Sequence, residues 1–305
     1  MSRITLLTTK LVEIFMDCDD FTKCFEKQMI ESGEKLPVKK MSSSEMMAIT
    51  IYYHHSGLKC FKYYYEIIIK GHLESYFPKS YSYENFVSKM SDVNCFLFIF
   101  LQTLRLSCPT EANYVDATKL VVSHNKRIKN HQVFKDFAQR GKSSTGWFYG
   151  FKLHAIINQY GQLVVCFFTP GNVADNNPEL LESLTNKITG FLFGDKGYLT
   201  TLKETFKERG LNLITKLREN MKPKIEDKIT PKQAYYLNHR GLIETVFDLL
   251  KNMCNIEHSR HRSPKNFMVN FTSGLIAYTY FDSFPSFPNY TEKFDTNKKY
   301  EIVLI

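Results

Sequence analysis

The sequence has little of what several protein classes require. Glycine and proline number 14 and 10 of 305 residues, too few for a collagenous or low-complexity chain. The longest apolar run, 93–101, is about half as long as a membrane-spanning helix and contains Asn94. Residues 1–15 lack the apolar core and small-residue cleavage site of a secretory signal. We therefore expect a globular cytoplasmic protein with no membrane partner.

Cysteine usage argues against a disulfide framework. The seven cysteines are odd in number and include no Cys-x-x-Cys pair, so we expect reduced thiols. Cys254, His258 and His261 are spaced like metal ligands, but a zinc site would lack its fourth ligand. The run RGKS at 140–143 resembles a phosphate-binding loop, yet Asp136 stands where that loop needs glycine. Neither a zinc site nor an ATP site is predicted.

Most of the positive charge lies in one short segment. The chain has 40 Lys and Arg against 31 Asp and Glu, a net charge of +9. Residues 1–105 carry 13 basic and 12 acidic side chains, whereas 119–142 carry seven basic and one acidic, a net charge of +6. Such a run is either a solvated surface or a contact surface for a polyanion such as nucleic acid, and charge alone leaves both open.

The first hundred residues have helical patterns. Ser42 followed by Glu45 is typical of a capping box, which predicts a helix that begins there. A second helix is expected over 59–70, ended by Gly71. Two helices joined in this way fit a DNA-reading helix-turn-helix or an ordinary bundle. We expect an all-helical, DNA-binding domain over residues 1–108.

Beyond Pro109 the pattern changes to strands and helices. The order predicts an α/β domain over 109–281, with a mixed five-stranded sheet flanked by helices. Residues 282–305 are expected to form a loosely structured tail. The expected strands are 113–118, 151–158, 162–169, 191–193 and 211–215, and the expected helices are 178–188, 202–209 and 231–253.

Three acidic residues are candidates for catalysis. Asp116 and Asp195 each follow an apolar strand, which places them at the sheet edge where α/β proteins hold ligands. Glu244 lies on the helix expected over 231–253, on one face with Arg240 and Lys251. The alternatives are turn or cap residues for the two aspartates, and a solvated helix face with ion pairs for the glutamate.

Three converging carboxylates would need a cation between them. Oxygen ligands prefer Mg²⁺ or Mn²⁺. Two such ions can activate an attacking oxygen and stabilise the leaving oxygen of a phosphodiester. The basic segment 119–142 would then neutralise the nucleic-acid backbone.

These residues match a family pattern over 114–280. The chain resembles bacterial insertion-sequence transposases of the DDE type, whose catalytic domain has an RNase H-like fold. The family signature Tyr-x2-Arg-x3-Glu-x6-Lys is matched except at its first position, where this chain has Leu237 with Tyr236 one place earlier. The matching runs are VDAT at 115–118, YGFKLH at 149–154, PGNVAD at 170–175, GDKGY at 194–198, and Arg240, Glu244 and Lys251.

The resemblance implies a bacterial, nucleoid-associated enzyme. It would cut double-stranded DNA at the terminal inverted repeats of an insertion sequence and join the 3′-hydroxyl to target DNA, as a homodimer or larger assembly. Asp116 would bridge two Mg²⁺ or Mn²⁺ ions, and Asp195 and Glu244 would each complete one site. The residues expected to contact DNA are Lys126, Arg127, Lys129, Lys142, Lys152, His154, Lys196, Arg240 and Lys251.

Several alternatives stay open on the sequence. His154 fits a phosphate contact or a hydrogen-bonded strand histidine equally well. Trp147, the only tryptophan, could stack on a DNA base, although aromatic residues beside strands are more often part of the core. The protein could also be a nuclease of the same fold that does not join strands, or a DNA-binding protein that has lost catalysis.

Overall fold

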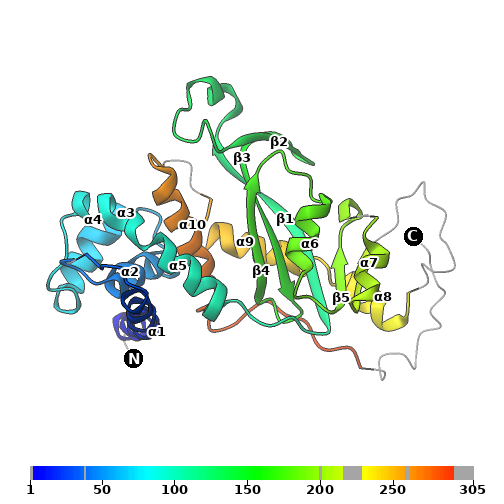
Figure 1. Cartoon of the computed structure of the whole chain (residues 1–305), viewed down its shortest axis with the longest axis horizontal. Helices are drawn as coiled ribbons and strands as arrows, with labels where there is room; N and C mark the ends of the chain where they lie inside the picture. Colours follow the sequence, from blue (N-terminus) through cyan, green and yellow to red (C-terminus); the bar gives the residue numbers. More distant parts are fainter. Residues whose placement is uncertain (1–2, 38, 199–200, 216–228, 258–260, 292–305) are drawn as a thin grey trace. The chain divides into compact units, whose positions relative to one another are not determined.

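The computed structural model describes residues 3–37, 39–198, 201–215, 229–257 and 261–291, with side chains from residue 8 onward. These residues form two compact units (Figure 1). The helical unit comprises the described residues up to 106 together with 248–282, and the sheet unit comprises those of 107–247 together with 283–291. None of the described helices is long and apolar enough to cross a membrane.

The helical unit is built around the buried helix α2. Ser42 caps it as expected, because its hydroxyl accepts a hydrogen bond from the Glu45 backbone N–H at 3.1 Å and the Glu45 carboxylate accepts one from the Ser42 N–H at 2.6 Å. Along α2 nearly every residue is buried, which fits the interior of a bundle. The helical elements are α1 (Arg3–Glu31), α2 (Ser43–His55), α3 (Phe61–Tyr63) continued by η1 (Tyr64–His72), η2 (Glu74–Tyr76), α4 (Tyr83–Lys89), η3 (Met90–Val93), α5 (Asn94–Phe100), η4 (Leu101–Arg105) and α10 (Pro264–Tyr278).

The segment 248–282 belongs to this helical unit, whereas the sequence places it in the domain 109–281. Buried polar contacts hold it there. The Cys254 carbonyl is 2.6 Å from Nδ1 of His54, and the Ser273 hydroxyl donates to the Thr50 hydroxyl at 3.2 Å. Such contacts join residues about 200 positions apart, so local patterns do not reveal them. DNA binding by the helical unit stays a prediction.

The sheet unit contains a mixed sheet of six strands in the described residues. The strand order is β2-β3-β1-β5-β6, with β4 also paired to β3. The β1, β3 and β4 pairings are antiparallel, whereas β1, β5 and β6 run parallel. The RNase H-like α/β class expected from the sequence is therefore present. The strands are β1 (Ala112–Ser123), β2 (Gln139–Ser143), β3 (Gly146–Asn158), β4 (Leu163–Pro170), β5 (Gly190–Gly194) and β6 (Leu211–Thr215).

All five expected strands are present, and β2 is the sixth. It lies inside the basic segment and pairs with the first part of β3, while β4 pairs with the remainder of the same edge. Gly141 of β2 passes so close to the Gly171 carbonyl that a Cβ would collide with it. This strand depends on contacts with distant residues and has no apolar alternation of its own, so the sequence did not predict it.

Helices cover both faces of this sheet. Val115 of β1 and Leu192 of β5 face an apolar core with α6 (Pro178–Thr185) and α7 (Lys203–Glu208). The alternate residues Tyr114 and Phe193 face α8 (Pro231–Asn238), where the Tyr114 hydroxyl donates to the Tyr236 carbonyl at 3.2 Å.

The single helix expected over 231–253 is wrong, because the structure has two. The first, α8, ends at Asn238, and α9 (Leu242–Asn252) begins after His239, Arg240 and Gly241. In this turn the Leu242 N–H donates to the His239 carbonyl, three residues back, instead of continuing the α-helical pattern. Arg240 therefore lies at the junction of the two helices and not within a continuous helix face.

Part of the expected loose tail is fixed to the sheet unit. The Phe287 ring packs on His239 at a centroid distance of 4.3 Å, and the Pro288 carbonyl accepts a hydrogen bond from the Tyr235 hydroxyl at 2.8 Å. The Gln159 amide donates to Asn289 at 2.7 Å. Residues 283–291 thus close over α8 and the β3–β4 turn, and the rest of the expected tail lies outside the described residues.

Candidate active site

Strand register brings Asp116 and Asp195 to the same edge of the sheet. The last parallel pair between β1 and β5 joins Tyr114 to Phe193, and each acid lies two residues further along the chain, Asp116 within β1 and Asp195 one residue beyond the end of β5. Because side chains alternate along a strand, both acids are on the face of Tyr114 and Phe193, which α8 covers. The sheet itself therefore places the two acids opposite each other.

Arg240 links the second and third candidate acids. One guanidinium nitrogen lies 3.8 Å from a carboxylate oxygen of Asp195, and another lies 3.6 Å from a carboxylate oxygen of Glu244. The arginine is largely buried, with its side chain 24% exposed, whereas the two acids are 54% and 62% exposed. The helix break positions this arginine, because it turns the chain between Tyr236 and Glu244 toward the strand ends.

The Asp116 carboxyl is the most buried of the three. Burial raises its pKa to about 6, and the negative charges of Asp175 and Asp195 act in the same direction. A hydrogen bond of 2.8 Å from the Ala117 backbone N–H and the positive charge of Arg240 oppose this shift. Burial is therefore the main reason that ionisation of Asp116 is costly in the free protein.

Tyr198 adds a buried hydroxyl that has no hydrogen-bond partner among the described residues. It follows Asp195 in a short helical turn, η6 (Lys196–Tyr198), and its side chain is 1% exposed. Burial raises the pKa of this phenol well above its usual value, and Asp116, Asp175 and Asp195 raise it further. The phenol therefore lies within electrostatic reach of all three aspartates.

Asp175 is a fourth acid of this region that the sequence did not single out. It follows β4, and its carboxylate accepts a hydrogen bond from the Lys152 ammonium at 2.8 Å. Its charge affects the pKa of Asp116. The sequence contained a signal that could have identified Asp175. Like Asp116 and Asp195, it comes after an apolar strand, and it is the last residue of the PGNVAD run.

The described residues contain no group of three His, Cys, Asp or Glu side chains close enough to hold a metal ion. The donor chemistry of the sheet edge nevertheless fits a hard divalent cation, since Asp116, Asp195 and Glu244 offer only carboxylate oxygens. The pKa of Asp116 is raised mainly by burial, and a divalent cation beside this carboxyl would lower it again. Arg240 now contacts two of the three acids, so ion binding would require these side chains to rearrange.

Two predicted DNA contacts point inward. The Lys152 ammonium donates to the Val173 carbonyl and to Asp175, and its side chain is 12% exposed. His154 is fully buried in β3, where its Nε2 lies 2.9 Å from the Thr169 hydroxyl. Burial lowers the pKa of His154, so the ring is neutral near pH 7. These contacts favour the hydrogen-bonded strand histidine over a phosphate contact.

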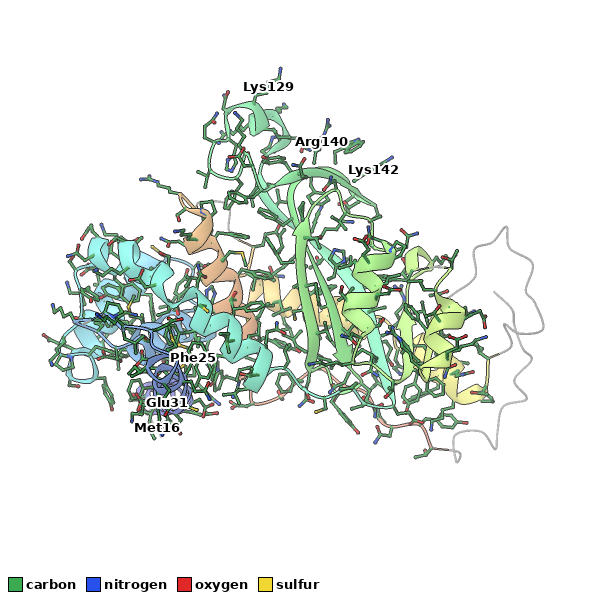
Figure 2. All side chains as sticks on the ribbon, in the orientation of Figure 1. Met16, Phe25, Glu31, Lys129, Arg140 and Lys142 are labelled. Carbon is green, nitrogen blue, oxygen red and sulfur yellow. The ribbon has the colours of Figure 1, made fainter. Side chains whose placement is uncertain are left out.

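Other predicted DNA contacts lie on an arm that extends from the sheet. The arm, residues 124–147, comprises η5 (Asn125–Asn130), the following turns, β2 and the start of β3. Lys126, Arg127 and Lys129 are exposed on η5, and Lys142 is exposed on β2. Figure 2 shows Lys129, Arg140 and Lys142 extending outward from this part of the sheet unit.

The remaining two predicted DNA contacts lie elsewhere. Lys196 is partly exposed directly after Asp195, and its backbone N–H donates to the Asp195 carboxylate at 2.7 Å. Lys251 belongs to the helical unit and forms an ion pair with Glu257 at 3.1 Å. Its contact with phosphate stays a prediction.

Trp147 is not part of the core. Its side chain is 53% exposed, and it packs beside Arg140 and Lys142 of the neighbouring strand. The core interpretation, which the sequence favoured, is therefore wrong. Trp147 pairs with Lys142 of β2 one residue after the start of β3, and it points to the opposite face from the buried Phe148 that follows it.

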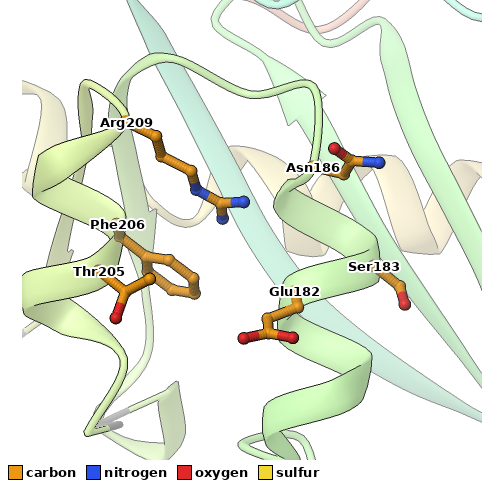
Figure 3. Close-up of a pocket in the computed structure, with 6 residues that line it drawn as sticks. All are labelled: Glu182, Ser183, Asn186, Thr205, Phe206 and Arg209. Carbon is orange, nitrogen blue, oxygen red and sulfur yellow. The ribbon is translucent and has the colours of Figure 1, made fainter.

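Neither of two further features extends the site. Cys254 is buried, and burial raises its thiol pKa to about 12, which disfavours the thiolate that zinc requires; His258 lies outside the described residues. An open pocket lies between α6 and α7, on the opposite face of the sheet from Tyr114 (Figure 3). It is lined by Glu182, Ser183, Asn186, Thr205, Phe206 and Arg209.

Comparison with known protein families gives one match. The family model described as a transposase DDE domain matches residues 106–264, which is more than half of the chain. No curated protein matches the chain significantly. The matched region includes the six strands, all three candidate acids and Arg240.

Proposed function

Because the chain belongs to the transposase DDE domain family, we propose that this DNA transposase cuts double-stranded DNA at the ends of an insertion sequence and joins the freed 3′-hydroxyl to target DNA. The observation that carries the proposal is the arrangement at the sheet edge. Register sets Asp116 opposite Asp195, and Arg240 spans Asp195 and Glu244.

Asp116, Asp195 and Glu244 would hold the divalent ions, either Mg²⁺ or Mn²⁺. Two such ions, when bound, supply activation of the attacking oxygen and stabilisation of the leaving oxygen. Burial of Asp116 makes its charged form costly in the free protein, so a cation beside it favours the ionised carboxylate. Arg240 provides a fixed positive charge at the same place, suited to a phosphate of the bound DNA.

The arm would supply much of the binding energy for DNA. Its exposed Lys126, Arg127, Lys129 and Lys142 can neutralise backbone phosphates, and such contacts are independent of base sequence. Lys196 would contact a phosphate next to Asp195. We also propose that the helical unit binds DNA and that the protein is cytoplasmic and associates with the nucleoid. It would act as a homodimer that pairs two DNA ends.

A nicking assay on DNA with the terminal repeats tests this function. With Mg²⁺ the parent should nick the DNA, and Asp116→Asn and Glu244→Gln should abolish nicking while DNA binding remains. Glu182→Gln is a matched control, because this exposed acid lies on α6, on the opposite face of the sheet. If both site variants cut as well as the parent, the site is assigned to the wrong residues.

The same assay separates the alternatives. A nuclease would release nicked products without joined strands, whereas a transposase also yields strand-transfer products with target DNA. A protein that has lost catalysis would bind the repeats and leave them intact at every Mg²⁺ concentration.

A further inference from the structure

Trp147 presents an aromatic ring to solvent from a rigid position. Its side chain is 53% exposed, while the next residue, Phe148, is 3% exposed and anchors the strand. The Trp147 carbonyl accepts a hydrogen bond from the Asn125 side chain at 2.6 Å, which ties η5 to the start of β3. The ring is thus held by the sheet ladder and not by a loop.

Two cations from the neighbouring strand flank this ring. The guanidinium carbon of Arg140 lies 4.7 Å from the centre of the Trp147 ring system, and the Lys142 ammonium lies 5.9 Å from it. Lys142 is the direct cross-strand partner of Trp147, and Arg140 is two residues away on the same face of β2. We call Trp147, Arg140 and Lys142 the stacking site.

The surroundings of the stacking site select an anionic ligand. The arm carries six basic residues against one acid, Asp136, a net charge of +5, and all six basic side chains are exposed. A polyanion that also offers flat apolar surfaces would satisfy both features at once. Single-stranded nucleic acid has both, because its base faces are accessible, whereas a duplex hides them in its stack.

The position of the arm relative to the acids suits a strand that leaves the active site. β1 continues past Asp116 for seven residues, to Ser123, where the arm begins. At about 3.3 Å per residue this spans roughly 23 Å in the direction of the strand ends. A DNA strand that is unpaired beside the acids could therefore continue along β1 and β3 to Trp147.

We propose that the stacking site binds an unpaired base of single-stranded DNA, with Trp147 stacked on the base and Arg140 and Lys142 contacting adjacent phosphates. The choice of DNA as the ligand rests on the proposed function. The binding itself needs neither cleavage nor a divalent ion.

Because Trp147 is the only tryptophan, its fluorescence reports on this site alone. In buffer with a metal chelator, a short oligothymidylate should quench the emission in a saturable way. The same oligonucleotide annealed to its complement with blunt ends should quench it much less. Absence of quenching by the single strand, or equal quenching by the blunt duplex, would refute the proposal.

Variants measured with a fluorescently labelled oligothymidylate give a second test. Trp147→Ala should weaken single-strand binding by roughly 5-fold or more, as expected for loss of one stacked base. Trp147→Phe should restore most of the affinity, because an aromatic face remains. Phe137→Ala is the matched control, since Phe137 is an aromatic residue of the same arm with 56% exposure, and its affinity should equal that of the parent.

The outcomes for this site and for the proposed function are distinguishable. If Trp147→Ala bound the single strand as tightly as the parent, the proposal of the stacking site would be refuted, whereas the nicking result would be unaffected. Conversely, Asp116→Asn should show the parent's fluorescence quenching although it does not nick DNA. A loss of binding in Phe137→Ala as large as in Trp147→Ala would show that the arm as a whole, and not the ring of Trp147, accounts for the effect.

Discussion

The acidic sheet edge and the basic arm are linked through β1 and β3, yet different forces fix them. Asp116 is partly buried, and the parallel pairing of β1 with β5 brings it near Asp195. The basic side chains of the arm are exposed, and they lie on η5, on the following turn and on the short strand β2. At the edge, the partly buried Asp116 holds a charge where it is costly, whereas the arm holds its charges where water solvates them. Substitutions at the edge should therefore affect chemistry and stability, and those on the arm should affect affinity and its salt dependence.

The largest expected effect is at Arg240. Arg240→Ala removes the cation that spans Asp195 and Glu244, and nicking should fall by about 100-fold or more, as for other fixed charges in active sites. Arg240→Lys should recover only part of this loss, because an ammonium cannot reach both acids with separate nitrogens. Single-turnover nicking with saturating enzyme measures the effect. Full activity in the alanine variant would show that the ion pairs have no role in catalysis.

Asp116 should make the free protein less stable as pH rises. Its folded pKa of about 6 lies above the ordinary value of 3.8, so the folded state binds the proton more tightly than the unfolded state. This tighter proton binding contributes at most about 3 kcal/mol to the free energy of unfolding. The contribution is complete below about pH 4 and is lost as pH rises through 6. Asp116→Asn lacks this loss and should be the more stable protein at pH 7.

Urea unfolding at several pH values, with a metal chelator present, measures that difference. The two curves of unfolding free energy against pH should diverge between about pH 4 and 6 and run parallel above. Curves that stay parallel throughout would mean that Asp116 is not desolvated in the folded protein.

Neutralising the arm should change affinity without changing stability. In Lys126→Ala/Arg127→Ala/Lys129→Ala the slope of log affinity against log salt should fall by about 2.7, or 0.9 for each lost phosphate contact. The thermal midpoint should stay the same, because all three side chains are exposed. Titration of duplex DNA at increasing salt concentrations checks this. An unchanged slope would assign η5 to the solvated surface.

The smallest expected effect is at Lys196. This residue adjoins the acid Asp195, but like the basic residues of the arm it is expected to contact a phosphate. Lys196→Ala should reduce the salt slope by about 0.9, the value for one phosphate contact. Lys187→Ala is the matched control, because Lys187 is exposed in the turn before β5, at the opposite end of this strand from Asp195. If both variants reduce the slope equally, the effect is one of net charge and not of position.

Much of the sheet unit could be predicted from local patterns. The apolar runs before Asp116 and Asp195 identify buried strands, and Asp195 directly follows its strand as expected, whereas β1 continues for seven residues beyond Asp116. Arg240 and Glu244 form the ion pair that their spacing of four residues suggests, although Arg240 lies before the start of α9 and not on a continuous helix. These features depend on neighbours in sequence, which is why they are readable without the fold.

Other features depend on residues far apart in the chain. Strand β2 requires Gly141 to pass the Gly171 carbonyl, and the break before α9 turns Arg240 toward Asp195. Asp175 joins the acids only because β4 folds back on β3. Trp147 is exposed because its neighbour Phe148 takes the inward position of the strand. No local pattern specifies any of these contacts.

The sequence by itself determined which residues are acidic, basic or apolar and at what period, and this was enough to predict five of the six described strands, the apolar runs before the two aspartates and the charge of the arm. Only the tertiary structure decided which of these charges are buried and which neighbour which. Burial sets the electrostatic cost of Asp116, and strand pairing sets Arg140 and Lys142 beside Trp147. Solvation and long-range strand pairing are properties of the packed chain. They decide whether a charged side chain is desolvated, as a catalytic acid can be, or exposed, as a side chain that binds DNA phosphate must be.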